Sequence, residues 1–490
     1  MKLENAVKYM NAEALNLNPA LLAAEVESFS IDSRQVKAGD VFFAFAQPDF
    51  SRNCFNGEFQ DSHKFIPSAF EKGAAACVVR PDKYEEQRVI LEEFRDRLIF
   101  VADGILALQN LAHGVFLEWN KPITAITGSA GKTTAKELTA HVLRASGRRI
   151  LSSEKNFNNG LGHPLTVLKL AADKTFDAAV LEMGMSTPSN EIARLCRITP
   201  PDVAVELNVL PVHVEHLGSI ENVARAKAEL IEGMKPDGTA VLNADDFRVA
   251  AMRDLHAGKT VTFGIAEKAD ISASEIEMKR FGETKFVLNA PNGRTDVRLP
   301  LSGRHNVLNA LAASAVGFVF GMSVREIADA LQSVTPPAQR GEVLHFAEGF
   351  TVINDSYNSN PAALLNMVET LVDGGKSAKR KIVVAGEMLE LGENEKEIHA
   401  ATGEKLSETG IDFLIGVRGL AKDLVEGAKK NNLDKTLFFE NSADAGEFLA
   451  TEIRSGDLVL VKGSRGVRTE RVIEKLLEKY SVENETTDRH

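Results

Sequence analysis

The sequence predicts an α/β protein of three domains: a small mixed α/β domain, a central domain with a mostly parallel sheet, and a C-terminal Rossmann-like domain. Its 490 residues are too many for one hydrophobic core and fit about three domains of roughly 150 residues each. From residue 114 onwards, short apolar runs alternate with helix-like stretches, which is typical of parallel sheets covered by helices. A glycine-bearing turn follows the first of these runs.

Composition is that of an ordinary globular protein from a reducing compartment. Hydrophobic residues make up 44% and charged residues 26%, as in soluble domains, and no apolar run approaches the ~20 residues that span a bilayer. The net charge of −12 comes without a basic block, which argues against nucleic-acid binding. Three cysteines without paired spacing indicate no disulfide framework. Because the acidic start of the chain is unlike a signal peptide, we expect a cytoplasmic protein without membrane insertion.

Residues 1–113 are predicted to form the small mixed domain. Apolar runs at Val41–Phe45 and Ala74–Val79 predict two of its strands. The stretch from Ala44 to Gln60 contains Pro, Asn, Gly and Ser and therefore predicts a loop.

Residues 114–334 are predicted to form the central domain, because polar or glycine-bearing turns follow each candidate strand. A long apolar helix is expected near Asn306–Phe320, and the prolines of Thr335–Pro337 would end the domain. The candidate strands are Ile123–Thr127, Ala178–Met183, Val203–Val209 and Ala240–Asn243.

Residues 335–490 repeat the alternation in five units, which indicates a Rossmann-like domain. No G-x-G-x-x-G motif occurs in it, so dinucleotide binding is not indicated. The polar tail from Ser481 to His490 predicts disorder. The candidate strands are Thr351–Asp355, Lys381–Ala385, Phe413–Val417, Thr436–Phe439 and Leu458–Lys462.

The turn after the first central strand reads Thr127-Gly-Ser-Ala-Gly-Lys-Thr-Thr134. Gly128 lies only three residues before Gly131, closer than in the usual P-loop G-x-x-x-x-G-K-[ST]. Glycine-flanked amides and the positive end of the following helix suit phosphate oxygens. Lys132 could bridge β- and γ-phosphates, and the Thr133 hydroxyl suits Mg²⁺. The pattern predicts a P-loop mononucleotide-binding domain.

Three further residues are candidates for metal binding. Glu182 ends a predicted strand, where ligands gather in open α/β sheets. His213 follows the next strand, and Lys227 lies on an alanine-flanked helix. From the residues alone, each has an ordinary alternative: a solvated strand end, a structural histidine and a solvated helix lysine.

These motifs together resemble those of the Mur ligases, the ATP-dependent amide ligases of peptidoglycan synthesis. Their loop T-G-[ST]-x-G-K-T-T has the short glycine spacing seen here. The resemblance runs along the whole chain in order and spacing. Its other segments are Asn156–Asn159, Glu182–Gly184, Asn208–His213, Ala226–Glu229, Asn243–Asp246, Gly303–Ala310 and Arg340.

Within the family, four segments are similar to those of the members that add D-alanyl-D-alanine to UDP-N-acetylmuramoyl-tripeptide. The D-N-P-R motif of the relatives that add diaminopimelate is absent. The four segments are Asp32–Arg34, Asn354–Pro361, Gly386–Gly392 with His399 downstream, and Val461–Gly466.

Four departures from the family pattern concern substrate contacts rather than the reaction. The Gln47–Gln60 stretch is longer than usual, and Ser62 replaces a glycine. Glu387 stands where Asp is common, and Met185–Asn190 replaces A-N-H-x-G.

The resemblance implies roles for individual residues. Thr133 and Glu182 would bind one Mg²⁺, and His213 with an N-carboxylated Lys227 would bind a second. The residues implied in ATP binding are Gly128, Ser129, Ala130, Gly131, Lys132, Thr133, Thr134, Asn306, Asn309, Arg340 and Asp355. Those implied in catalysis are Lys132, Lys227, His213, Arg340 and Asp355. Those implied in substrate binding are Ser33, Arg34, Asn158, Asn159, Tyr357, Asn358 and Asn360.

The implied reaction is a two-step ligation by a monomer. The tripeptide carboxylate attacks the γ-phosphate of ATP, and the amine of D-alanyl-D-alanine then attacks the acyl phosphate. Because water would hydrolyse that intermediate, the C-terminal domain should close over the ATP domain. Three alternatives remain open: a folylpolyglutamate-synthase-like or other Mur ligase with another amino substrate, a nucleotide-binding regulatory module, and a P-loop kinase.

Overall fold

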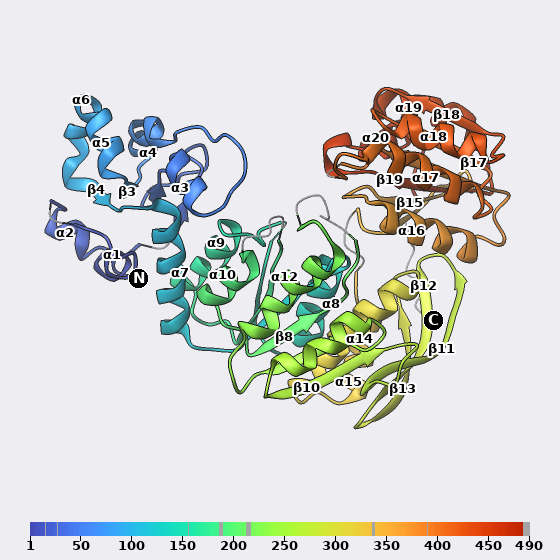
Figure 1. Ribbon diagram of the computed structural model, residues 1–490, viewed down its shortest axis with the longest axis horizontal. Helices are drawn as coiled ribbons and strands as arrows, with labels where there is room; N and C mark the ends of the chain where they lie inside the picture. The colour runs from blue at the N-terminus through green and yellow to red at the C-terminus, as the bar shows by residue number, and fades with distance from the viewer. Residues whose placement is uncertain are drawn as a thin grey trace.

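The computed structural model describes residues 1–14, 16–26, 28–154, 156–185, 190–211, 217–335, 339–389 and 391–483, apart from the side chains of residues 279 and 280. It contains three sheets, each with helices packed against it. The N-terminal part lies at the upper left and the C-terminal part at the upper right, with the central part below and between them (Figure 1). The predicted three-domain α/β architecture is confirmed.

The N-terminal sheet has four parallel strands in the order β1-β2-β3-β4. Its strands are β1 Phe29–Ser30, β2 Val41–Phe43, β3 Ala76–Val79 and β4 Leu98–Phe100. Its helices include α1 Leu3–Tyr9, α2 Pro19–Leu22, α3 Gln47–Arg52, α4 Ile66–Glu71, α5 Pro81–Glu86 and α6 Arg88–Leu91.

The prediction of a loop for the whole Ala44–Gln60 stretch is wrong, because α3 lies within it. Pro48 in its first turn is compatible with a helix start, where the missing N–H removes no helical bond. Asp49 accepts a hydrogen bond from the Ala46 N–H at 2.8 Å and thereby satisfies one of the free amides at the helix start.

Helix α7, Gly104–Trp119, joins the first part of the molecule to the second. It packs against α1 and α3 of the N-terminal part, and against α9 (Gly162–Leu168) and α10 (Glu191–Ile198) of the central part. The predicted domain boundary after residue 113 falls inside this helix.

The central sheet has nine strands in the order β13-β12-β11-β10-β9-β8-β5-β7-β6. Its strands are β5 Ile123–Thr127, β6 Ile150–Ser152, β7 Ala178–Glu182, β8 Val203–Glu206, β9 Thr239–Asn243, β10 Lys259–Gly264, β11 Ile271–Arg280, β12 Glu283–Ala290 and β13 Gly293–Leu299. Its helices include α8 Lys132–Ala145, α9 Gly162–Leu168, α10 Glu191–Ile198, α12 Ile220–Glu232, α13 Phe247–Ala251, α14 Arg304–Val319 and α15 Val324–Gln332.

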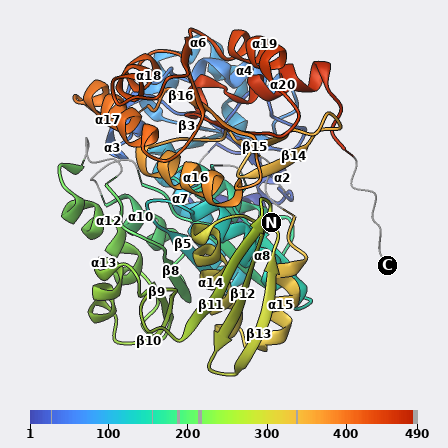
Figure 2. The same cartoon turned by 90° about the vertical axis from the view of Figure 1, so that its right-hand side faces the viewer.

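The four predicted central strands are present, and β8 ends at Glu206 rather than at Val209. The sheet is mostly parallel, as predicted, but β11, β12 and β13 form antiparallel pairs at one edge. Figure 2 shows these strands extending away from the helices around β5.

The C-terminal sheet has six strands in the order β14-β15-β19-β16-β17-β18. The five predicted strands are confirmed and are parallel, whereas the edge strand β14 is antiparallel. The strands are β14 Glu342–His345, β15 Thr351–Asp355, β16 Arg380–Gly386, β17 Phe413–Val417, β18 Thr436–Phe439 and β19 Asp457–Lys462. The helices are α16 Pro361–Gly374, α17 Glu395–Ser407, α18 Ala421–Lys430, α19 Ser442–Glu452 and α20 Glu470–Lys479.

The predicted boundary prolines Pro336 and Pro337 and most of the predicted polar tail from Ser481 onwards lie outside the described residues. Over the described part of the chain, every helix is too short or too polar to cross a bilayer.

Candidate active site

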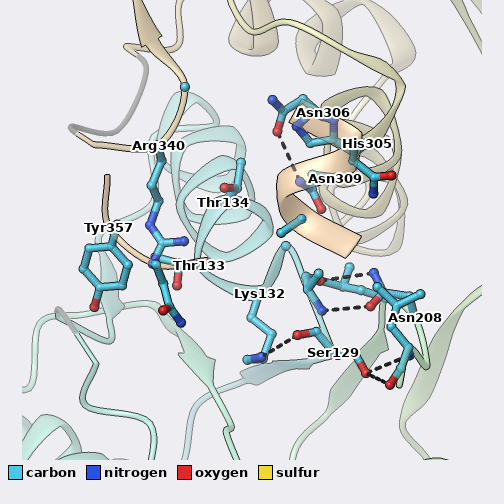
Figure 3. Close-up of a pocket in the computed structure, with 18 of the residues that line it drawn as sticks. Ser129, Lys132, Thr133, Thr134, Asn208, His305, Asn306, Asn309, Arg340 and Tyr357 are labelled. Atoms are coloured by element: carbon cyan, nitrogen blue, oxygen red, sulfur yellow. Dashed lines mark hydrogen bonds between the residues drawn. The ribbon is translucent and has the colours of Figure 1, made fainter. Parts of the chain in front are cut away.

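The glycine-bearing loop connects β5 to α8, as the sequence predicts. Gly128 has φ 155° and Gly131 has φ 83°, and only the latter lies well inside the left-handed region that favours glycine. A Cβ on Gly131 would lie 2.5 Å from Asn309 Oδ1 on α14. The loop is thus wedged against α14, and a side chain at residue 131 would displace it (Figure 3).

The segment after β8 holds the loop in place (Figure 3). The Ser129 N–H donates to the Asn208 carbonyl at 2.9 Å, and the Ala130 N–H donates to Asn208 Oδ1 at 2.9 Å. Ser129 Oγ accepts from the Leu210 N–H at 2.9 Å. The amides in the first turn of α8 have no carbonyl partner in their own helix, so they remain suited to an anion.

Lys132 folds back over this loop. Its ammonium donates to the carbonyls of Gly128 at 2.8 Å and Ser129 at 3.3 Å. Burial lowers the pKa of Lys132, and the carboxylates of Glu182 and Glu206 oppose that shift. A partly buried cation held by these carbonyls is well placed to exchange them for phosphate oxygens.

Thr133 and Glu182 form an oxygen-rich pair at the edge of the cavity. Thr133 Oγ1 donates to Glu182 Oε2 at 2.8 Å, and Asn158 Nδ2 donates to Glu182 Oε1 at 2.8 Å. Glu182 ends β7 and is buried. A hydroxyl and a carboxylate are hard ligands, and Mg²⁺ typically takes one or two such groups besides phosphate oxygens and water. The residues present fit that ion.

The second predicted metal pair is described only in part. Lys227 lies on α12 and is 2% exposed. Burial, and secondly the positive charge of Lys132, lowers the pKa of Lys227 to about 7. His213 lies outside the described residues.

Glu206 is a functional candidate that the sequence reasoning missed. It ends β8 beside Thr127 of β5, is fully buried, and neither of its carboxyl oxygens has a hydrogen-bond partner among the described residues. Burial raises the pKa of Glu206 to about 8, against the opposing charges of Lys227 and Lys132. The sequence signal that could have identified Glu206 is the presence of a charged residue inside the predicted strand Val203–Val209.

Replacing Glu206 by glutamine should remove a pH dependence of stability. The raised pKa means that folded Glu206 stays protonated while the unfolded chain ionises, so stability falls as pH rises from about 4.5 towards 8. The gain of Glu206→Gln over the parent should therefore grow with pH and reach the order of several kcal/mol. The lowered pKa of Lys227 makes stability rise with pH above about pH 7. The apparent Tm of the two proteins is therefore best compared between pH 5 and 7, where this opposite effect is small. Parallel Tm curves for the two proteins would contradict the assignment.

One cavity of about 440 Å³ joins the central and C-terminal parts. The C-terminal part contributes Arg340, whose guanidinium lies 4.0 Å from the Tyr357 ring centroid, and the ion pair between Asp355 and Lys462 at 2.5 Å. Lys462 also donates to the Asn358 carbonyl at 2.9 Å. The predicted residues that line the cavity are Ser129, Ala130, Gly131, Lys132, Thr133, Thr134, Asn158, Glu182, Asn306, Asn309, Arg340, Asp355, Tyr357, Asn358 and Asn360.

The remaining predicted residues lie elsewhere or have structural partners. Asn159 Oδ1 accepts from the Leu161 and Gly162 amides at the start of α9. Asn360, although it lines the cavity, caps α16 through a bond from the Ala363 N–H. Ser33 and Arg34 belong to the N-terminal part and do not line this cavity. Gly128 and Lys227 belong to the central part but do not line it either.

The C-terminal motifs meet at Ser464. Its hydroxyl donates to the Ser359 carbonyl at 3.2 Å and accepts from the Leu389 N–H at 3.0 Å. His399 is buried, and its Nε2 accepts from the Met388 N–H at 3.0 Å. His399 thus supports the loop after β16 rather than facing the cavity.

Comparison with known proteins agrees with these features. The "Mur ligase middle domain" family matches residues 126–317, and the "Mur ligase, glutamate ligase domain" family matches residues 339–465. The UDP-N-acetylmuramoyl-tripeptide–D-alanyl-D-alanine ligase of Bacillus subtilis is 32% identical over 94% of this chain and 95% of its own. The Escherichia coli ligase of the same name is 31% identical over 94% of this chain and 96% of its own.

Solved structures lead to the same family. MurF from Acinetobacter baumannii has a TM-score of 0.83 at 28% identity and covers 98% of this chain and 99% of its own. MurF ligase from Thermotoga maritima, solved in complex with ADP, has a TM-score of 0.78 at 30% identity and covers 93% of this chain and 98% of its own. These matches show that the chain belongs to the Mur ligase family, and the cavity lined by the shortened phosphate loop and the C-terminal ion pair agrees with that.

Proposed function

We propose that this chain is an ATP-dependent ligase that joins D-alanyl-D-alanine to UDP-N-acetylmuramoyl-tripeptide, giving UDP-N-acetylmuramoyl-pentapeptide, ADP and phosphate. One observation carries the proposal: the phosphate loop and the C-terminal motif residues Asp355, Tyr357 and Lys462 line the same cavity. The named relatives, matched over nearly their whole length, support the substrates. Such a reaction belongs to cytoplasmic peptidoglycan precursor synthesis.

The proposed roles on the ATP side follow from charge and position. Lys132 and the amides of the loop hold the β- and γ-phosphates. Arg340, stacked on Tyr357, neutralises charge on the transferring phosphoryl group. Asn306 and Asn309, buried on α14, contact the nucleotide.

Two Mg²⁺ sites are proposed. Thr133 and Glu182 hold the first, and a carbamate on Lys227 with His213 holds the second. Bound at these places, the ions would offset the negative charge that gathers on the phosphate oxygens. The lowered pKa of Lys227 supports the carbamate, because only a neutral amine reacts with CO₂.

Ligation then takes two steps. The carboxylate oxygen at the end of the tripeptide bonds to the γ-phosphorus while the bond to ADP breaks. Next, the dipeptide amine bonds to the acyl carbon, phosphate leaves and the amine loses a proton. The C-terminal part lies across the cavity from the phosphate loop, so its closure would exclude water from the acyl phosphate.

Phosphate release tests the proposal. The enzyme is incubated with ATP, Mg²⁺ and UDP-N-acetylmuramoyl-tripeptide, with D-alanyl-D-alanine added or omitted. We expect release only with both partners, together with a product heavier by one dehydrated dipeptide. Release that responds instead to another amino acid keeps the family and overturns the dipeptide. Absence of release with every pairing would contradict the ligase.

A further inference from the structure

A buried lysine outside the proposed chemistry lies behind the phosphate loop. Lys136 is on α8, one turn beyond Lys132, and is 1% exposed. Its ammonium donates to the Ser153 carbonyl at 2.7 Å and pairs with Glu137. Burying an ammonium is costly unless its hydrogen bonds are satisfied. The Ser153 carbonyl is the buried partner that Lys136 finds at this place.

Ser153 connects this lysine to Glu182. It follows β6, is buried, and its N–H donates to the Val180 carbonyl of β7 at 3.3 Å. Its Oγ accepts from the Glu182 N–H at 3.0 Å. The main chain of Glu182 is therefore held by the residue that Lys136 anchors.

The same segment also holds the Glu182 side chain. Five residues after Ser153, Asn158 donates to Glu182 Oε1 at 2.8 Å, and its carbonyl accepts from the Gly184 N–H at 2.8 Å. Ser153 therefore binds the backbone of Glu182, and Asn158 binds its carboxylate. Lys136 fixes the start of that segment.

Lys136 also shares a helix with the other proposed ligand. Thr133 precedes it by three residues on α8, so the two side chains lie on one face of the helix. The Thr133 Oγ1 to Glu182 Oε2 distance of 2.8 Å depends on how α8 is tied to β6 and β7. The bond from Lys136 to Ser153 is one such tie.

We propose that Lys136 is a positioning residue that holds Glu182 opposite Thr133 and so sets the geometry of the first metal site. The inference rests on the proposed metal role of Thr133 and Glu182. Mg²⁺ demands near-ideal octahedral geometry, and loss of an outer-shell partner typically costs 10- to 100-fold in metal affinity.

Two variants separate this role from others. Lys136→Met keeps the apolar stem and removes the ammonium, whereas Ser153→Ala removes only the hydroxyl that accepts from Glu182. If Lys136→Met fails to fold, Ser153→Ala still tests the link. Lys169→Met is the matched control, because Lys169 pairs with Glu154, the neighbour of Ser153, at the surface. Glu137→Gln removes the exposed partner of Lys136 and keeps the bond to Ser153.

The measurement is Mn²⁺ binding to the enzyme–ADP complex, followed by the EPR signal of free Mn²⁺. We expect Lys136→Met and Ser153→Ala to raise the Kd for Mn²⁺ about 10-fold, and the two controls to change it less than about twofold. The affinity for metal-free ADP should stay unchanged in all four variants. A substitution that only destabilised the phosphate loop would weaken the binding of ADP as well.

Glu182→Gln serves as the reference in this assay. If it weakens Mn²⁺ binding while Lys136→Met and Ser153→Ala bind like the parent, the positioning role is overturned and the metal assignment stands. If Glu182→Gln leaves Mn²⁺ binding unchanged, the proposed metal site itself fails.

Discussion

Replacing Lys132 by methionine is expected to lower kcat/KM for ATP by at least about 10³-fold. The ammonium of Lys132 lies over the loop carbonyls of Gly128 and Ser129 and is the cation nearest in sequence to the amides that receive the phosphates. During transfer, negative charge spreads over the oxygens of the phosphoryl group. A cation that is partly removed from water stabilises that charge more strongly than an exposed one, because less water screens it.

The same substitution should stabilise the nucleotide-free protein. Burial lowers the pKa of Lys132, so folding disfavours its charged form and the lysine costs stability below its unfolded pKa. Among the described residues, no carboxylate lies within ion-pair distance of its ammonium to offset that cost. Methionine keeps the length of the stem without the charge, so the apparent Tm should rise while ligation is lost.

Steady-state ligation and thermal unfolding of the two proteins check this pair of outcomes. Lys174→Met is a suitable control, because Lys174 is exposed and pairs with Glu118 at the surface. Ligation within about tenfold of the parent would exclude the phosphate role of Lys132. A lowered Tm of Lys132→Met would show that the bonds from Lys132 to the loop carbonyls stabilise the nucleotide-free protein.

The phosphate loop could be predicted because its signal is local. Gly128, Gly131, Lys132 and Thr133 lie within six residues of one another between an apolar strand and a helix, and each has a separate physical reason to be there. The strands of the C-terminal part were predictable for a related reason. Strands buried on both faces by helices read as continuous apolar runs.

Residues whose role depends on distant pairing could not be predicted in this way. Lys462 reaches Asp355 across 107 residues of sequence only because β19 lies beside β15 in register. The burial of Glu206 depends on packing around β8 that no local pattern shows. The antiparallel edge formed by β11 to β13 was missed because its strands carry many polar and charged residues.

Removing dissolved CO₂ is expected to abolish most of the activity, and bicarbonate should restore it. The carbamate proposed on Lys227 forms when its neutral amine bonds to the carbon of CO₂ and loses one proton, leaving an anionic oxygen donor. Burial and the charge of Lys132 lower the pKa of Lys227 to about 7, so much of it is neutral near pH 7.5. An ordinary lysine, with a pKa near 10.4, would be protonated there.

The pH dependence has a definite sign. Below about pH 7 the amine of Lys227 takes up a proton, so the carbamate and the activity that depends on it should decline as pH falls. Lys227→Met, which cannot carry the group, should lose about 10²- to 10³-fold in kcat, on the scale of one removed electrostatic stabiliser. Its residual rate should be insensitive to bicarbonate.

Carbon-13 NMR of enzyme equilibrated with ¹³C-bicarbonate measures the group directly. We expect one slowly exchanging carbamate resonance in the parent and none in Lys227→Met, with a matching loss of the rate when CO₂ is purged. Lys235→Met is the control, because Lys235 is partly exposed and pairs with Asp202 at 2.8 Å near the end of the same helical region. A parent enzyme that keeps its full rate without CO₂ and shows no such resonance would mean that Lys227 acts as the amine. The second metal site would then lack one of its two proposed ligands.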